Sequence, residues 1–112
     1  MTAPVDLANL RSMTDGDAEM EKALFEEFFS SFEAGIASLQ PNTGEAAAEA
    51  WRKQAHGLKG MALNLGAIQL GELCAKGQDE PHADANAKSE LLKNIQAEYG
   101  RVKQFLLKTI NV

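Results

Sequence analysis

The sequence lacks the features that would tie a protein to an oxidising compartment, to a membrane or to nucleic acid. Its 112 residues include a single cysteine, Cys74, which excludes an internal disulfide. No stretch reaches the roughly 18 apolar residues of a membrane-spanning helix, and the N-terminus shows no signal-peptide pattern. Lys and Arg total 11 against 16 Asp and Glu, a formal charge of −5 without any basic run. We therefore expect a cytoplasmic protein that binds neither a membrane nor nucleic acid.

Apolar residues recur at helical spacing along most of the chain, and no segment alternates with the period of two that indicates a strand. The spacing and the breaks between periodic segments predict helices over about 7–13, 17–39, 45–65, 67–79 and 85–110. Because 45% of the residues are hydrophobic, the chain can build one core. The prediction is an all-α protein, an antiparallel four-helix bundle with a short extra N-terminal helix, forming a single domain over residues 1–112.

Several helix ends carry residues that favour capping. Asp17 and Asp84 are predicted N-caps of the second and last helices, since their carboxylates can accept from free backbone N–H groups. Asn42 and Glu45 have the spacing of a capping box before the third helix. Gly66 suits the left-handed position that ends that helix.

Phenylalanines concentrate in the second predicted helix. The residues predicted to pack into the core repeat every three or four positions: Phe25, Phe29, Phe32, Ile36 and Leu39. Leu24 and Phe28 lie at the edge of this stripe, where we expect partial exposure. Both are therefore candidate contacts for a partner.

The helix predicted over 45–65 carries an unusual polar face. Its apolar stripe comprises Trp51, Ala55, Leu58, Ala62 and Leu65. At about 100° per residue, His56 points away from the stripe, Gly60 points almost opposite to it, and Lys59 lies one turn along on the His56 side. Glycine inside a helix costs roughly 0.5–1 kcal/mol relative to alanine, so a glycine on the solvent face indicates close approach by another surface.

These residues support phosphoryl chemistry. A neutral imidazole nitrogen is a nucleophile that can attack an activated phosphoryl group and form a covalent phosphohistidine. The transition state needs positioning and positive charge, because negative charge spreads over the phosphoryl oxygens. Lys59 is placed to supply that charge, and Gly60 leaves room for the active site of a partner. In isolation, an ordinary surface histidine and a solvated surface lysine would be the default interpretations of His56 and Lys59.

In this context the sequence resembles the histidine-containing phosphotransfer (Hpt) domain family. The motif is His56-x-x-Lys59-Gly60, preceded by Ala55 and followed by Asn64-Leu65-Gly66-Ala67. The resemblance covers nearly the whole chain, through Asp6-Leu7-x-x-Leu10, Gly16-Asp17, the phenylalanine run, and Leu70-x-x-Leu73-Cys74 followed by Gln78. It implies a helical bundle and a phosphocarrier role in a multistep two-component phosphorelay.

The resemblance also implies roles for individual residues. The histidine at the position of His56 exchanges a phosphoryl group with an aspartate of response-regulator receiver domains, and in some members with a hybrid sensor histidine kinase. The lysine at the position of Lys59 helps to hold the phosphoryl group. A glutamine where Gln78 falls, on the facing helix, orients the imidazole. Met61 departs from the family pattern, where Ser or Ala is frequent, and we expect it to alter the rim of the docking surface.

Further docking contacts are predicted around the motif. Leu63 lies near the imidazole's side of its helix, together with Leu24 and Phe28 of the preceding helix. Arg52 and Lys53, one turn before His56, are placed to attract an acidic receiver surface, although solvated charges would look the same in the sequence.

We expect no cofactor on this chain. Any Mg²⁺ would belong to the partner receiver domain, since no carboxylates cluster near His56. The two histidines and Cys74 lack the spacing of a zinc site, and Cys74 is expected to pack in the core. No Gly-rich phosphate loop is present, so the expected protein is a monomeric phosphocarrier with no kinase activity of its own.

Other interpretations stay open. A non-catalytic helical adaptor would use the same patch for binding alone. An acid–base or metal-dependent enzyme is disfavoured by the lack of clustered carboxylates, and a dimerising histidine-kinase domain by the short connections. The Met1 start favours a free-standing protein over a domain of a larger kinase.

Overall fold

The structure, a computed structural model, describes residues 3–110, so residues 1, 2, 111 and 112 of the predicted domain lie outside it. The described residues form five helices and no strand: α1 (Leu7–Thr14), α2 (Ala18–Ser38), α3 (Glu45–Leu65), α4 (Ile68–Asp79) and α5 (Ala85–Ile110). Each predicted helix is present, and the all-α fold is confirmed.

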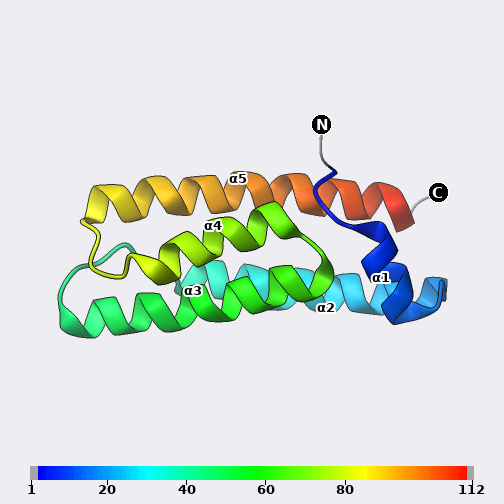
Figure 1. Ribbon diagram of the computed structural model, residues 1–112, viewed down its shortest axis with the longest axis horizontal. Coiled ribbons are helices and arrows are strands. Elements are labelled where there is room, and N and C mark those ends of the chain that lie inside the picture. Colours follow the sequence, from blue (N-terminus) through cyan, green and yellow to red (C-terminus); the bar gives the residue numbers. More distant parts are fainter. Residues whose placement is uncertain (1–2, 111–112) are drawn as a thin grey trace.

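The four longer helices run antiparallel to their neighbours along the 45 Å length of the molecule. In Figure 1, α4 lies between α3 and α5, and α2 lies behind them. The short α1 packs against α2 at the end of the bundle where α2 begins. The architecture is therefore the predicted antiparallel four-helix bundle with an extra N-terminal helix. No helix within residues 3–110 has both the length and the hydropathy needed to cross a bilayer.

Local capping explains where most helices begin and end. The Asp17 carboxylate accepts from the backbone N–H groups of Glu19 at 2.9 Å and Met20 at 3.1 Å. The Asp84 carboxylate accepts from the Ala87 N–H at 2.8 Å, so both predicted N-caps are confirmed. Gly66 ends α3 in the left-handed conformation, with φ of 97°, as predicted.

The predicted capping box between Asn42 and Glu45 is wrong. α3 begins at Glu45 with Gly44 as N-cap, at φ of 106° and without a side-chain capping bond, so Asn42 lies two residues too early to cap. The Asn42 carbonyl instead accepts from the Lys88 ammonium of α5 at 2.8 Å. A long-range contact thus replaces the local one that the spacing suggested.

Most of the apolar stripes predicted for the helices are buried in the core, but the buried face of α2 differs from the predicted one. Phe28 is only 6% exposed, whereas Phe29 is half-buried, so the partial exposure predicted for Phe28 is wrong. The Phe28 ring packs 5.3 Å from the Phe32 ring and 6.1 Å from the Tyr99 ring of α5. Because α1, α3 and α5 all contact α2, its buried face is wider than one stripe.

A buried polar chain joins α5, α3 and α4. Lys88 is 1% exposed and places its ammonium 5.2 Å from the centre of the Trp51 ring. The Trp51 indole N–H donates to the Gly77 carbonyl of α4 at 2.9 Å. That carbonyl lies in the last turn of α4, and the residue four positions later is Pro81, which has no N–H to donate. The same carbonyl also accepts from the Glu80 N–H at 3.3 Å, so Trp51 adds a second donor to it and holds the end of α4 against α3.

Candidate functional site

His56 and Gly60 lie exposed in the middle of α3, and Lys59 is half-buried beside them. A Cβ atom at Gly60, or at the neighbouring Gly57, would meet no heavy atom within 4 Å. Neither glycine has the positive φ that would require it. Packing within this chain therefore does not explain two glycines in a helix of 21 residues. They leave a bare strip of backbone next to the imidazole.

Two close contacts set the register of α3 against α4. A Cβ at Gly71 would collide with the Leu63 side chain, and a Cβ at Gly77 would lie 3.5 Å from the Ala55 Cβ. Since the helices are antiparallel, moving back from Leu63 to Ala55 on α3 corresponds to moving forward from Gly71 to Gly77 on α4. Gly77 is thus level with Ala55 and the next residue, Gln78, with Gln54, which lies two residues, or about 3 Å along the axis, before His56.

Gln78 is half-buried, and its amide oxygen is buried without a hydrogen-bond donor among the residues that the structure describes. Leaving a buried acceptor unpaired costs about 1–3 kcal/mol, so such a group needs a reason. An imidazole N–H is a donor of the kind that this oxygen lacks. Gln78 therefore offers an unpaired acceptor on α4 within one helical turn of His56 along the axis.

The charges on α3 fall into two groups. Arg52 donates to the Glu49 carboxylate at 2.7 Å and 3.3 Å, and the Lys53 ammonium lies 3.8 Å from it. The Arg52 hydrogen bond lowers the pKa of Glu49 and raises that of Arg52. Lys59 makes no ion pair within residues 3–110. Its ammonium is the α3 cation that no carboxylate of the described part of the chain neutralises.

The predicted docking residues lie on opposite sides of α3. Leu63 is 42% exposed and covers Gly71 on the α4 side. Leu24 and Phe28 belong to the α2 side, where a cleft of about 210 Å³ opens between α1, α2 and α3. We call it the methionine cleft; it is lined by Met13, Leu24, Glu27, Phe28, Ser31, Met61, Asn64 and Leu65. Sequence reasoning missed Met13, because nothing local indicates that α1 folds back onto α2.

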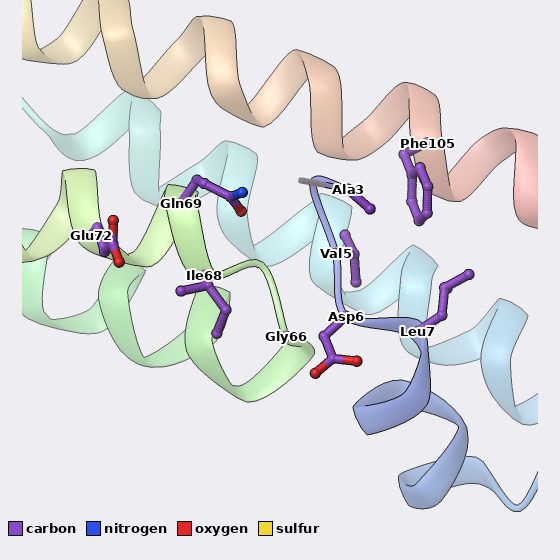
Figure 2. A pocket seen from close by; sticks show the side chains of 9 residues that line it. All are labelled: Ala3, Val5, Asp6, Leu7, Gly66, Ile68, Gln69, Glu72 and Phe105. Carbon is purple, nitrogen blue, oxygen red and sulfur yellow. The ribbon is translucent and has the colours of Figure 1, made fainter. Parts of the chain in front are cut away.

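A larger cavity, of about 700 Å³, lies away from His56. Figure 2 shows it between the segment before α1, the start of α4 and Phe105 of α5. Of its lining residues, Gly66, which follows the last residue of α3, is ten residues past His56 and so about 15 Å from it along the helix axis. The carboxylates of Asp6 and Glu72 line it. This cavity adds nothing to the chemistry at the imidazole.

A family model for the Hpt domain matches residues 23–105. No curated protein and no solved structure matches the chain at a significant level. The chain belongs to the Hpt domain family. Hpt domains serve phosphotransfer in two-component signalling and interact with response regulators and kinases. The matched range of this Hpt domain contains the whole α3 motif and all of α4, whereas α1 lies outside it.

Proposed function

We propose that this Hpt domain accepts a phosphoryl group on His56 and exchanges it with the aspartate of response-regulator receiver domains. The observation that carries the proposal is the arrangement on α3, in which an exposed imidazole lies between an unneutralised ammonium and two glycines that packing does not require. Family membership supplies the reaction class. A hybrid sensor kinase is the expected source of the phosphoryl group upstream of the receiver.

In the proposed step, an imidazole nitrogen of His56 attacks the phosphorus of the receiver's aspartyl phosphate. The new N–P bond forms as the P–O bond breaks, and the aspartate carboxylate leaves. Lys59 stabilises the negative charge on the phosphoryl oxygens. Mg²⁺ on the receiver would neutralise charge on the other side. The reverse sequence of the same bonds returns the phosphoryl group to a receiver.

We assign Gln78 to hold the imidazole. Its unpaired amide oxygen, within one helical turn of His56 along the axis, is assigned to accept from the ring N–H and leave the other nitrogen free to attack. Leu24, Leu63, Arg52 and Lys53 are proposed to contact the receiver around the imidazole. We propose that the protein acts as a cytoplasmic monomer without kinase activity of its own.

The deciding experiment is transfer of radiolabel from phosphorylated receivers of the same cell to this protein and to its His56→Gln variant. Label that is acid-labile and base-stable on the wild type, and absent from the folded variant, would support the proposal. Failure of every receiver to label the folded wild-type protein would overturn it in favour of a non-catalytic adaptor. A label that persists on His56→Gln would assign the acceptor to another residue.

Two further variants test the supporting residues. Lys59→Ala should slow transfer on the order of tenfold or more, because a charge aimed at the phosphoryl oxygens is lost. Lys93→Ala, an exposed lysine on α5, is the matched control and should transfer normally. Gln78→Leu should slow transfer without lowering stability, since it removes an oxygen that has no donor in the described structure. A variant that loses stability and keeps its transfer rate would make Gln78 structural.

A further inference from the structure

The methionine cleft has the composition of a site for an apolar side chain. Phe28 and Leu65 are buried at its base, and Met13 and Met61 form flexible walls. The side chains of Glu27, Ser31 and Asn64 give it a polar rim, the usual surroundings of an apolar anchor at a protein interface. Within this rim the Ser31 hydroxyl donates to the Glu27 carboxylate at 3.0 Å. A cavity of about 150 Å³ holds benzene, so the 210 Å³ here can take one large apolar side chain.

The cleft is continuous with the bare strip beside His56. Gly57, Gly60 and Asn64 follow one another at spacings of three and four, so they form one row along the α2 side of α3. Met61, next to Gly60, is five residues past His56, about 7.5 Å along the axis. Nothing bulky on this row separates the imidazole from the cleft. A surface that descends onto His56 over the glycines therefore reaches the cleft.

α2 forms the other side of the same groove. A Cβ at Gly35 would lie 2.5 Å from Leu58 Cδ2 and 3.8 Å from Met61 Cε, so α2 and α3 touch closely here. In this antiparallel register, Ala34 and Ser38 lie on either side of the level of His56 and within about one helical turn of it, and both are exposed. With Ser31 they form a row of small side chains at spacings of three and four. The groove that runs from His56 to the cleft is thus bordered by small side chains on α2 and by glycines on α3.

We propose that the methionine cleft receives an apolar side chain of the docking receiver domain and sets which receivers this Hpt domain accepts. The proposal rests on the proposed phosphotransfer at His56 and deepens it by naming a specificity element. Met13, one wall of the cleft, comes from α1, which the family model does not match. The flexible thioether walls let the cleft adapt to anchors of different shape. Selectivity should therefore change when the cleft is filled or stiffened.

Filling the cleft gives the first test. Ser31→Phe places a ring in it, and Ser30→Phe adds the same ring one residue away on an exposed position of α2 that does not line it. Transfer from phosphorylated receivers should fall about tenfold for Ser31→Phe and stay unchanged for Ser30→Phe. Equal losses in both variants, or wild-type transfer by a folded Ser31→Phe protein, would overturn the proposal.

A small phosphodonor separates docking from chemistry. Phosphoramidate is such a donor: the His56 nitrogen attacks its phosphorus, and ammonia leaves as the P–N bond of the donor breaks. The reaction therefore needs no receiver. If Ser31→Phe and the wild type react alike with phosphoramidate, the loss with receivers is a loss of docking. A parallel loss with phosphoramidate would mean that the substitution disturbs the imidazole, and it would count against the cleft.

Methyl NMR tests the same contact without any transfer. Unphosphorylated receiver domains should shift the methyl signals of Met13 and Met61 and leave that of Met20, which is 53% exposed and does not line the cleft. Shifts confined to Met20, or no shift while the receiver binds, would overturn the proposal. If wild-type His56 takes no label from phosphoramidate, the phosphoacceptor assignment fails, and this titration still decides whether the cleft binds receivers.

Discussion

Replacing Gly60 by alanine should stabilise this Hpt domain and impair its reaction with receivers. The added Cβ would meet no heavy atom within 4 Å, and Gly60 does not have a positive φ. The folded state therefore accepts the methyl group without strain, and the unfolded chain loses conformational freedom. The expected gain is about 0.5–1 kcal/mol, the difference between glycine and alanine inside a helix. For a domain of this size, that gain raises Tm by roughly 2–4 °C.

The same methyl group lies where the receiver is proposed to descend on His56. An overpacked contact costs typically 1–3 kcal/mol, so transfer from phosphorylated receivers should fall on the order of tenfold or more. Gly100→Ala is the matched control, because Gly100 is also exposed within a helix and a Cβ there would meet nothing within 4 Å. It lies on α5, and we expect the same gain in Tm with normal transfer.

Circular dichroism during heating and the radiolabel assay measure the two effects separately. A fall in Tm for Gly60→Ala would refute the inference that the position is unpacked. A rise in Tm with unchanged transfer would refute the role of Gly60 in partner approach. Impaired transfer by Gly100→Ala would show that stabilisation itself, and not the added methyl group at the interface, slows the reaction.

Three further results are expected. Trp51→Phe removes the indole N–H that donates to the Gly77 carbonyl, and urea unfolding should show a loss of about 1–2 kcal/mol; an unchanged midpoint would contradict this role. The Lys103 ammonium lies 2.8 Å from the Glu33 carboxylate and lowers its pKa. The ionised carboxylate therefore stabilises the fold above pH 4.5, its ordinary pKa, and this contribution fades as the pH falls below that value. Glu33→Gln should therefore be slightly less stable than wild type at pH 7, and the difference should shrink as the pH falls through the lowered pKa; a pH-independent difference would refute the assignment. Burial raises the pKa of Cys74 to about 12, so iodoacetamide should alkylate it at pH 8 only after unfolding, and rapid alkylation of the native protein would contradict its burial.

The sequence by itself determined the features that depend on neighbours along the chain. A carboxylate two or three residues before free backbone N–H groups caps a helix wherever it occurs, so Asp17 and Asp84 marked helix starts correctly. The turn of 100° per residue likewise put His56 and Gly60 on the face opposite the buried stripe, and both are exposed. Local geometry carries these predictions, and long-range packing did not override them.

Tertiary structure decided which residues at the border of each helix's apolar stripe are buried. Phe28 and Phe29 are adjacent and chemically identical, so only the arrival of α1, α3 and α5 around α2 determines which of them is buried. The burial of Lys88 against Trp51 depends equally on a contact between distant elements. Burial at a stripe's edge is a property of the neighbouring helix, which the periodicity of one segment does not contain.

The site divides in the same way. The spacing of His56, Lys59 and Gly60 on one helix was sufficient to predict their shared surface, because a helix fixes their relative positions. The distance of Gln78 from His56 along the bundle, by contrast, depends on Gly71 admitting Leu63 beneath the start of α4, which sets the register between two helices. The methionine cleft depends on a third helix folding back. Such contacts are made by close packing across elements, and only the folded chain specifies them.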